Sequence, residues 1–301
     1  MQNIIQNLII GLQIGAVYAL IAVGYTMVYG VLRLINFAHG DVYMVGAFVG
    51  LKLAERLGMN VASTPGGFAL VFALTAAICA LVGMIIEFLA YRPLRKAPRI
   101  TALITAIGVS LLIEAIAQMI WGAKPQYFPR IFPPTIFQFL GATISSSYLL
   151  ILLASVVLMG VLWYVVIGTK MGKAMRAVAW DREAAALMGV NPNLVISFTF
   201  ALGSALAGVT GLIVSALTNV SISPLIGVMP GLKAFVSAVL GGIGSIPGAL
   251  LGGLLMGLAE TFVAANPAIT TWRDAIAFVL LILILMFRPA GIMGRSVVEK
   301  V

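Results

Sequence analysis

Long apolar runs separated by short charged segments restrict what this chain can fold into. A helix that crosses the hydrocarbon core of a bilayer needs about 20 mainly apolar residues. Of the 301 residues, 62% are hydrophobic and 9% are charged, whereas a soluble domain carries about 25% charged residues. We therefore predict an integral membrane protein. The runs that approach or reach a spanning length are Ile4–Val31, Val42–Leu57, Gly66–Ile86, Thr101–Trp121, Tyr148–Ile167, Leu194–Leu217 and Trp272–Phe287.

One further run, Leu232–Ala265, is too long for one span and too short for two full spans. The segment GGIGSIPG, Gly241–Gly248, interrupts it. The run before it, Leu194–Leu217, leads outward from a basic inside loop. The basic C-terminal tail can then lie inside only if Leu232–Ala265 crosses the membrane inward and returns outward before the last run. We predict two short or tilted helices that meet at a cytoplasmic Gly/Pro turn. The predicted fold is an all-α, polytopic helical bundle of about eight spans, which forms a single transmembrane domain over residues 1–301.

The Lys and Arg positions support this orientation, because short cytoplasmic loops carry an excess of these residues. The predicted topology leaves the N-terminus outside and puts two thirds of the 18 basic residues inside. The inside set is Arg33, Arg92, Arg95, Lys96, Arg99, Lys170, Lys173, Arg176, Arg182, Arg288, Arg295 and Lys300. The Pro-rich segment Ala123–Thr135 becomes the largest outside loop, and its prolines predict irregular structure.

A polar group interrupts the apolar pattern early in the chain. The stretch LRLINFAHGDVYMVGA, Leu32–Ala47, contains Arg33, Asn36, Asp41 and the only histidine, His39. Asp41 is placed to cap the following helix, with Gly40 easing the turn. The Asn36 amide and the His39 imidazole can satisfy backbone groups freed at a helix break. The alternative, which the sequence leaves open, is that Asn36, His39 and Asp41 line a translocation path.

A second polar group lies inside a predicted span. Ser110, Glu114 and Gln118 follow one another at a spacing of four, so they share one helix face. A carboxylate within a span usually faces protein or water. These residues either line a path, or Glu114 binds a neighbouring helix or a second subunit. Glu260 is expected at a subunit interface, and Glu87 is expected to be a membrane-boundary charge near Arg92.

Catalysis and cofactor binding find little support in the residues. A Ser/His hydrolase would need His39, and the G-x-S-x-G elbow is missing. One His and the single cysteine, Cys79, cannot supply the three or four ligands of a zinc site. The basic residues form no tract with interleaved aromatics, which argues against nucleic acid. Asn266-Pro267-Ala268 matches the aquaporin tripeptide, but those channels carry two copies and this chain has one. We predict no metal, no cofactor and no enzymatic activity of its own.

Nucleotide binding by this chain is also disfavoured. The segment GTKMGKA, Gly168–Ala174, has three residues between its glycines instead of four, and Lys173 is not followed by Ser or Thr. If this chain takes part in ATP-driven transport, a partner protein must therefore bind and hydrolyse the ATP.

The segment Lys170–Asn191, KMGKAMRAVAWDREAAALMGVN, is the most informative inside loop. It starts as an amphipathic helix. Asp181 can then cap a short second helix, with Glu183 in its first turn and Gly189 placed to end it. One interpretation is an amphipathic segment lying at the lipid headgroups. The other is a short helix presented to a cytoplasmic protein.

The same segment resembles a known docking motif. Glu183-Ala184-Ala185, followed by three residues and Gly189, is similar to the EAA-x-x-x-G loop by which ABC importer permeases dock on their ATPases. The Ile and Leu-Pro pair that continue this motif are missing, since the chain reads FTFALG around Thr199. The resemblance assigns ATPase docking to Asp181, Arg182, Glu183, Ala184, Ala185 and Gly189, within a cytoplasmic coupling-helix segment over residues 170–191.

Longer blocks carry a more specific resemblance. They are YALIAVGYTMVYGVLRLINFAHGDVYMVGA, GVNPNLVISFTFALGSALAGVTG, SPLIGVMPGLKAFVSAVLGGIGSIPGALLGG and RDAIAFVLLILILMFRPAGIMG. They resemble the branched-chain amino acid ABC permeases of the LivH type over nearly the whole chain. The resemblance implies a multi-pass protein of the bacterial cell inner membrane. It also implies a small-molecule substrate delivered by a periplasmic amino-acid-binding protein, a second, LivM-like permease subunit and two ATP-binding subunits that hold the ATP.

Two alternatives remain open at this point. Urea and short-chain amide permeases share much of the pattern, so the transported solute is less certain than the type of machine. A self-sufficient channel or secondary carrier is the other alternative. The EAA-like loop favours the ABC importer over a channel or carrier.

Overall fold

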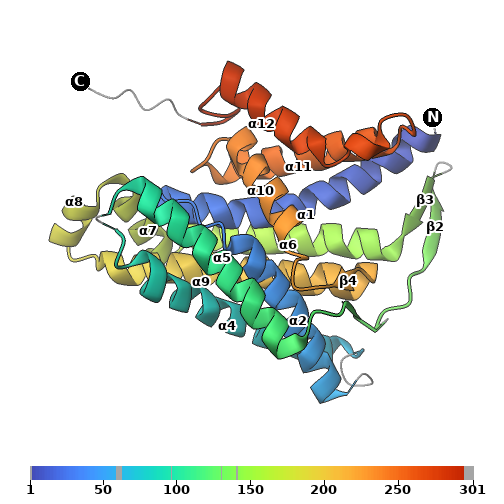
Figure 1. Cartoon of the computed structure of the whole chain (residues 1–301), viewed down its shortest axis with the longest axis horizontal. Helices are drawn as coiled ribbons and strands as arrows, with labels where there is room; N and C mark the ends of the chain where they lie inside the picture. The colour runs from blue at the N-terminus through green and yellow to red at the C-terminus, as the bar shows by residue number, and fades with distance from the viewer. Residues whose placement is uncertain (1, 59–62, 96, 130, 140–141, 295–301) are drawn as a thin grey trace.

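The computed structural model describes residues 2–58, 63–95, 97–129, 131–139 and 142–294, and nearly all of the regular structure is helical (Figure 1). Among these described residues, six helices are long and apolar enough to cross a membrane. They are α1 (Gln2–Leu32), α4 (Pro65–Ile86), α5 (Arg99–Trp121), α6 (Ser146–Gly168), α9 (Pro192–Thr218) and α11 (Ile246–Ala264). Helices α10 (Val228–Gly241) and α12 (Ala275–Phe287) are shorter and apolar, and α2 (His39–Leu57) carries charged residues at both ends. The prediction of a polytopic helical bundle is confirmed.

Short elements connect these helices at the two ends of the bundle. A π-helical turn, η1 (Glu87–Tyr91), extends α4, and a 3-10 turn, η2 (Thr270–Trp272), precedes α12. The helices α7 (Lys170–Trp180) and α8 (Arg182–Leu187) lie between α6 and α9. The strands are β1 (Gln126–Tyr127), β2 (Ile136–Phe139), β3 (Ala142–Ser145) and β4 (Ser221–Ile222).

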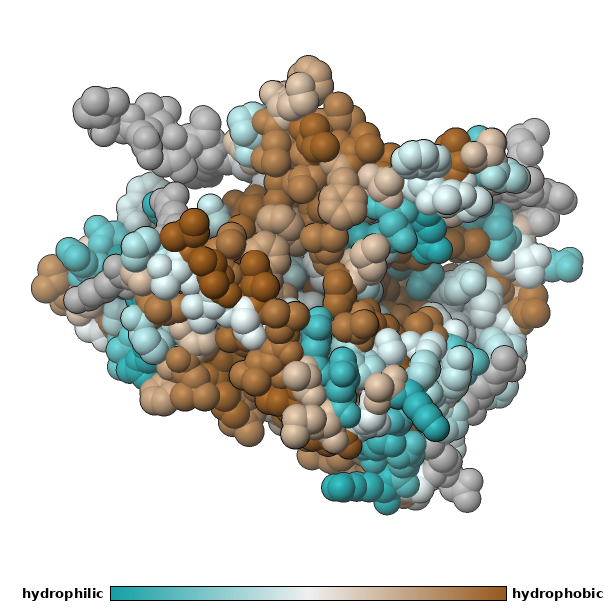
Figure 2. Space-filling model, in the orientation of Figure 1, coloured by the Kyte–Doolittle hydropathy of each residue, from teal (hydrophilic) through white to brown (hydrophobic). Residues whose placement is uncertain are grey.

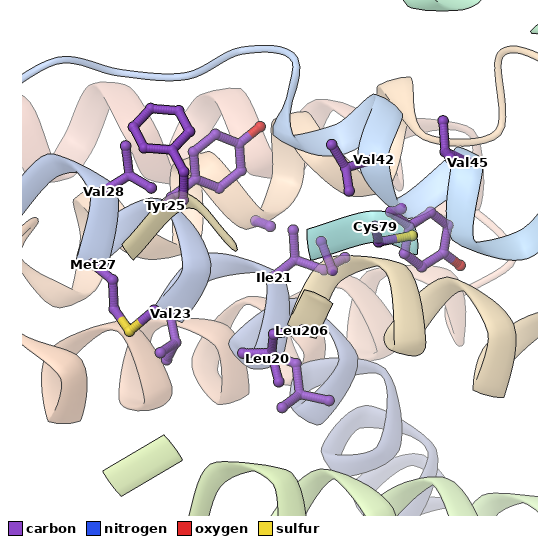
Figure 3. Packing of buried hydrophobic residues seen from close by; sticks show 14 of the residues in the cluster. Leu20, Ile21, Val23, Tyr25, Met27, Val28, Val42, Val45, Cys79 and Leu206 are labelled. Carbon is purple, nitrogen blue, oxygen red and sulfur yellow. The ribbon is translucent and has the colours of Figure 1, made fainter. Parts of the chain in front are cut away.

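The core is built from α1, α2 and α9, with α10 and α11 packed beside α1 (Figure 1). Within their apolar windows α1 and α9 are each 72% buried, whereas α5 is only 17% buried. Figure 3 shows Leu20 and Ile21 of α1 close to Leu206 of α9, with Val42 and Val45 of α2 nearby. The peripheral helices α4, α5 and α6 expose large apolar side chains. Figure 2 shows brown apolar side chains where α4 and α5 lie and, at the top, over α12, with teal polar side chains mainly on the right and at the far left.

Glycines allow α2 and α9 to cross at backbone contact. A Cβ atom added to Gly46 would lie 2.1 Å from the Gly208 carbonyl oxygen and 2.3 Å from the Gly208 Cα. One added to Gly211 would lie 2.1 Å from the Tyr43 carbonyl oxygen. Small residues let helices approach closely in lipid, where helix association depends on van der Waals packing. Gly46, Gly208 and Gly211 therefore let α2 and α9 pack in direct backbone contact.

The predicted hairpin is formed by α10 and α11, whose connection passes through Gly242 and Gly244 at positive φ. Its turn lies at the end of the bundle where α1 finishes, because a Cβ on Gly30 would contact the Gly244 Cα at 3.9 Å. The C-terminal segment joins the same end, where the Ile292 amide donates to the Leu240 carbonyl oxygen at 2.9 Å. Arg33, Arg95 and Arg182 also meet at this end. The basic segments predicted to share one side of the membrane are thus together.

The opposite end carries the N-terminus and the two small sheets (Figure 1). The Gln6 side chain exchanges two hydrogen bonds of 2.7 Å with the backbone of Thr143 in β3. The Pro-rich segment predicted to be irregular contains β1, which pairs with β4 in antiparallel register, and it buries Phe128. The predicted outside loop is therefore attached to the bundle at both β1 and Phe128.

Single cysteines test this arrangement of ends in the membrane. Cysteines placed at Ser245 and at Ser296, which lies outside the described residues, should be labelled by an impermeant maleimide only from the cytoplasmic side. Arg56→Cys, at the exposed far end of α2, should be labelled only from the other side. The unchanged chain is the control, because Cys79 is fully buried. Labelling of Ser245→Cys from outside would contradict the hairpin topology.

Candidate functional site

The helix break between α1 and α2 is the centre of the first candidate site. Arg33 adopts a φ of 56°, which turns the chain away from α1, and α2 begins only at His39. The N-cap residue Ala38 has no side-chain capping hydrogen bond. The prediction that Asp41 caps α2 is therefore wrong, because the helix starts two residues earlier and Asp41 lies in its first turn. Gly40 lets the start of α2 approach the start of α10 closely, since a Cβ there would lie 2.7 Å from the Gly227 carbonyl oxygen.

Asn36 connects the break to η1. The hydroxyl of Tyr91 in η1 lies 3.1 Å from Asn36 Oδ1 and 3.2 Å from the Ile35 carbonyl oxygen. The backbone carbonyl freed at the break is thus satisfied by Tyr91, with Asn36 as a second acceptor. Asn36 itself is 2% exposed, and its Nδ2 has no partner among the described residues. The hydrogen bonds of Tyr91 therefore couple the position of the helix break to the position of η1.

His39 fills the space between α1 and α9. Its ring lies 4.7 Å from the Tyr25 ring in an edge-to-face arrangement, and a Cβ on Gly24 would collide with its Nε2 at 2.2 Å. Nε2 has no partner among the described atoms. The adjoining cavity, lined by Tyr25, Tyr29 and Phe235, measures only about 10 Å³. This cavity is therefore too small to hold a solute in this conformation.

The polar face of α5 meets α2 at Asp41. The Ser110 hydroxyl donates a hydrogen bond to Asp41 Oδ2, and the Glu114 carboxyl, one turn further along α5, also interacts with Asp41. Gln118 lies another turn along and is exposed. The structure thus brings Asp41, Ser110 and Glu114 together beside the helix break and leaves Gln118 outside this group.

The predicted docking segment has the expected local structure. Asp181 Oδ1 accepts hydrogen bonds of 2.9 Å from the amides of Glu183 and Ala184, which caps α8. Gly189 has a φ of 85° and follows the end of α8. The Val190 amide then donates to the Ala185 carbonyl oxygen at 3.0 Å. Both the predicted cap and the predicted glycine stop are confirmed.

The docking segment exposes apolar side chains at its tip. Trp180, Leu187 and Met188 are 87%, 89% and 85% exposed, and α8 projects at the end of the molecule (Figure 1). Only Ala185 of α8 is buried. On the preceding helix α7, Met175 and Val178 pack inward as the amphipathic pattern predicted. A projecting apolar tip beyond a packed helix is typical of a surface that a protein partner covers.

A buried ion pair beneath this segment was not predicted. Glu87, expected to be a boundary charge beside Arg92, is instead fully buried and pairs with Arg95. The Ser197 hydroxyl of α9 donates to the second oxygen of Glu87 at 2.6 Å, and Arg95 also donates to Asn193 Oδ1. Glu87 therefore joins η1 and the α4–α5 loop to the start of α9, immediately after α8. A π-helical turn at this position is a feature often found at functional sites.

A second buried ionic network lies toward the other end of the bundle. Glu260 of α11 is fully buried, and it accepts from Lys233 at 2.9 Å, from Arg273 Nε at 2.6 Å and from the Tyr18 hydroxyl at 2.7 Å. Lys233 also contacts Asp274 at 2.6 Å, and this hydrogen bond holds the pKa of the Asp274 carboxyl below its usual range. The expectation of Glu260 at a subunit interface is wrong, since its partners lie within this chain.

Within the described part of the chain, no group of three or more His, Cys, Asp or Glu side chains is placed to hold a metal ion. The two ionic networks contain positive partners for each buried carboxylate, which makes them structural ion pairs. The site residues are therefore suited to positioning helices against one another.

Comparison with known proteins was made on the whole sequence. The profile of a family described as "Branched-chain amino acid transport system / permease component" matches residues 7–285. The chain is 42% identical to the high-affinity branched-chain amino acid transport system permease protein BraD of Pseudomonas aeruginosa, with 99% of this chain and 98% of that protein aligned. It is 41% identical to the permease protein LivH of Escherichia coli, with 99% and 97% aligned. No solved structure matches.

Proposed function

Since the chain belongs to the branched-chain amino acid transport permease family, we propose that it is a membrane-spanning permease subunit of an ABC importer for leucine, isoleucine and valine. A periplasmic binding protein delivers the solute. Two partner subunits hydrolyse ATP, and a second, LivM-like permease completes the path across the bacterial inner membrane. This chain supplies no ATPase site and binds no cofactor.

The observation that carries the ABC assignment is the capped, projecting helix α8 with its exposed apolar tip. Trp180, Leu187 and Met188 face solvent on a segment that has its own cap and its own glycine stop. A self-sufficient channel or carrier would have no use for such a surface. An ATPase that docks there would cover the tip and could move α8 as a rigid unit.

A continuous set of contacts leads from α8 to the helix break. Asn193 and Ser197, at the start of α9, bind Arg95 and Glu87. Glu87 begins η1, and Tyr91 at the end of η1 contacts Asn36 at the break. We infer that displacement of α8 by the ATPase shifts η1, which then moves the helix break and changes the packing between α1, α2 and α10. A residue in this series of contacts can shift the equilibrium between two conformations of the chain only if its own contacts differ between those conformations.

Our choice of transported solute rests on the activity named for the relatives and on the side chains that line the small cavity beside Tyr25. The side chains around the small cavity beside α1 and α10 are mostly aromatic or aliphatic, with Tyr25, Tyr29 and Phe235 among them. Such walls suit an apolar side chain. Urea or a short-chain amide is the second candidate, because small polar solutes would use Asn36 and the Asp41–Ser110 pair instead.

Reconstitution in liposomes tests the proposal. The complete complex should take up leucine, isoleucine and valine only with hydrolysable ATP and binding protein, while this chain alone should take up none. A non-hydrolysable ATP analogue is the matched control, and uptake of radiolabelled solute is the measurement. Uptake by the isolated chain down a solute gradient would contradict the ABC assignment. ATP-driven uptake of urea without leucine uptake would support the ABC importer assignment and contradict the branched-chain amino acid substrates.

A further inference from the structure

A pocket of about 230 Å³ opens at the end of the molecule that carries α8. Three arginines from three separate segments line it: Arg33 from the helix break, Arg95 from the α4–α5 loop and Arg182 from α8. Its walls also include Leu32, Leu34 and Leu94. One water occupies about 30 Å³ in the liquid, so this pocket has room for a polyatomic group.

The positive charge of this pocket is incompletely neutralised. Glu87 pairs with Arg95, but its carboxylate is fully buried beneath the pocket and also accepts from Ser197. Among the described residues, the ion pairs include no partner for Arg33 or Arg182. Burial, together with the charge of Arg95, lowers the pKa of Arg182. The Arg95 and Arg182 guanidiniums are therefore near enough to disfavour each other's charge.

Arg95 has a donor left over. Its Nη2 binds Glu87 and its Nη1 binds Asn193, whereas its Nε is buried and has no partner among the described residues. A buried donor without an acceptor is costly to a folded protein. An anion placed in the pocket would neutralise the charges of Arg33 and Arg182, which have no ion-pair partner among the described residues.

We propose that this pocket binds a phosphate group, supplied either by the headgroup of an anionic phospholipid or by free inorganic phosphate. A phosphate offers several acceptor oxygens, which match the planar fork of N–H donors that each guanidinium presents. The apolar walls formed by Leu32, Leu34 and Leu94 favour a phosphate attached to a lipid. Basic pockets between helices on the cytoplasmic side of membrane proteins commonly hold such headgroups.

Binding would have a mechanical consequence. The three arginines belong to the end of α1, to the α4–α5 loop and to α8. One phosphate that contacts all three would hold α8 against the helix break. The bound group would thus set how firmly α8 is attached to the rest of the chain.

The test uses the purified full chain without any partner. Its thermal unfolding is followed in neutral phosphatidylcholine nanodiscs, in nanodiscs containing phosphatidylglycerol, and in detergent with sodium phosphate or with sodium glutamate at equal ionic strength. We expect phosphatidylglycerol or phosphate to raise the Tm by about 3 °C or more. Arg33→Gln and Arg182→Gln should remove most of this rise, and Arg182→Lys should keep only part of it. Arg288→Gln is the matched control, because Arg288 is exposed and does not line the pocket.

The four conditions distinguish binding of a lipid headgroup from binding of free phosphate. A rise with phosphatidylglycerol in nanodiscs but not with free phosphate identifies a lipid, and a rise with free phosphate alone identifies the soluble ion. Either result supports the site provided that the two glutamine variants lose the rise and Arg288→Gln keeps it. If glutamate stabilises as well as phosphate, the pocket accepts a carboxylate, such as an acidic side chain of a partner protein, and the proposal is overturned. Absence of any rise, or a rise of equal size in every variant, also overturns it.

Discussion

Gly46→Leu should abolish recovery of folded chain from the membrane. The Cβ of the new side chain would lie 2.1 Å from the Gly208 carbonyl oxygen and 2.3 Å from the Gly208 Cα. Both are backbone atoms of α9, so no side-chain rotation can relieve the collision and the two helices must separate. Overpacking of a core commonly costs about 1–3 kcal/mol, and a backbone collision places this site at or above the upper end. Size-exclusion chromatography after mild detergent extraction measures the folded fraction.

Gly160→Leu is the matched control for this change. Gly160 lies within α6, and a Cβ there meets no atom within 4 Å. The two variants share the same substitution in a long apolar helix, so they have similar effects on helix propensity and on insertion. Gly160→Leu should elute as the unchanged chain does. A normal elution profile for Gly46→Leu would show that α2 and α9 do not cross at this glycine.

Gly189→Leu should reduce ATP-driven leucine uptake by the complete complex at least about tenfold while membrane insertion stays normal. Gly189 has a φ of 85°, where a residue with a β-carbon is strained by about 1 kcal/mol or more. No atom lies within 4 Å of an added Cβ, so the strain would alter the end of α8 without disturbing the bundle. Uptake, solute-stimulated ATP hydrolysis and co-purification of the ATPase are the measurements.

Two comparisons make this result specific to the docking segment. Gly58→Leu is the control, because Gly58 has the same φ of 85° and equally open surroundings but lies at the other end of the bundle. Glu183→Lys should act in the same direction as Gly189→Leu but more weakly, since a charge in the first turn of a helix contributes about 0.3–1 kcal/mol. If Gly189→Leu and Glu183→Lys both transport at the wild-type rate, docking must be sought elsewhere, first in Arg92–Arg99.

Features encoded within a few residues could be predicted from the sequence. The spans follow from the length of apolar runs, and the α10–α11 hairpin follows from one run of awkward length with a Gly/Pro interruption. The capping of α8 by Asp181 and its stop at Gly189 involve hydrogen bonds between residues close together in the chain. Local chemistry therefore specifies these elements without knowledge of the tertiary structure.

Contacts between distant residues could not be predicted in the same way. Glu87 accepts from Ser197, 110 residues further along the chain, and Tyr18 donates to Glu260 across 242 residues. A charge near the end of an apolar run looks the same in sequence whether it faces water or lies buried against a partner on another helix. Glu260 and Glu87 were misplaced for this reason. One weak signal was present, because fully charged carboxylates are rarely left inside spans without a positive partner.

The helix break was located correctly, but the roles of its residues were only partly predicted. Asp41 was predicted to cap the helix after the break, but α2 begins earlier because Ala38 and His39 already adopt helical geometry. His39 packs into space that glycines leave open on α1 and α9. That environment depends on the crossing of two helices, which the sequence pattern around His39 does not describe.

The ionic network around Glu260 has a consequence for how the chain enters the membrane during synthesis. A lysine at the centre of a helix disfavours insertion by about 2.5–3.5 kcal/mol, and Lys233 lies on α10, a helix of only 14 residues. Its second partner, Asp274, is made 41 residues later. Helix α10 therefore gains its compensating charges only after α11 and the segment before α12 have been synthesised. The last quarter of the chain, from α10 onward, should leave the translocation machinery as one unit. A ribosome stalled between α10 and α11 should hold a helix that has not yet been released into lipid.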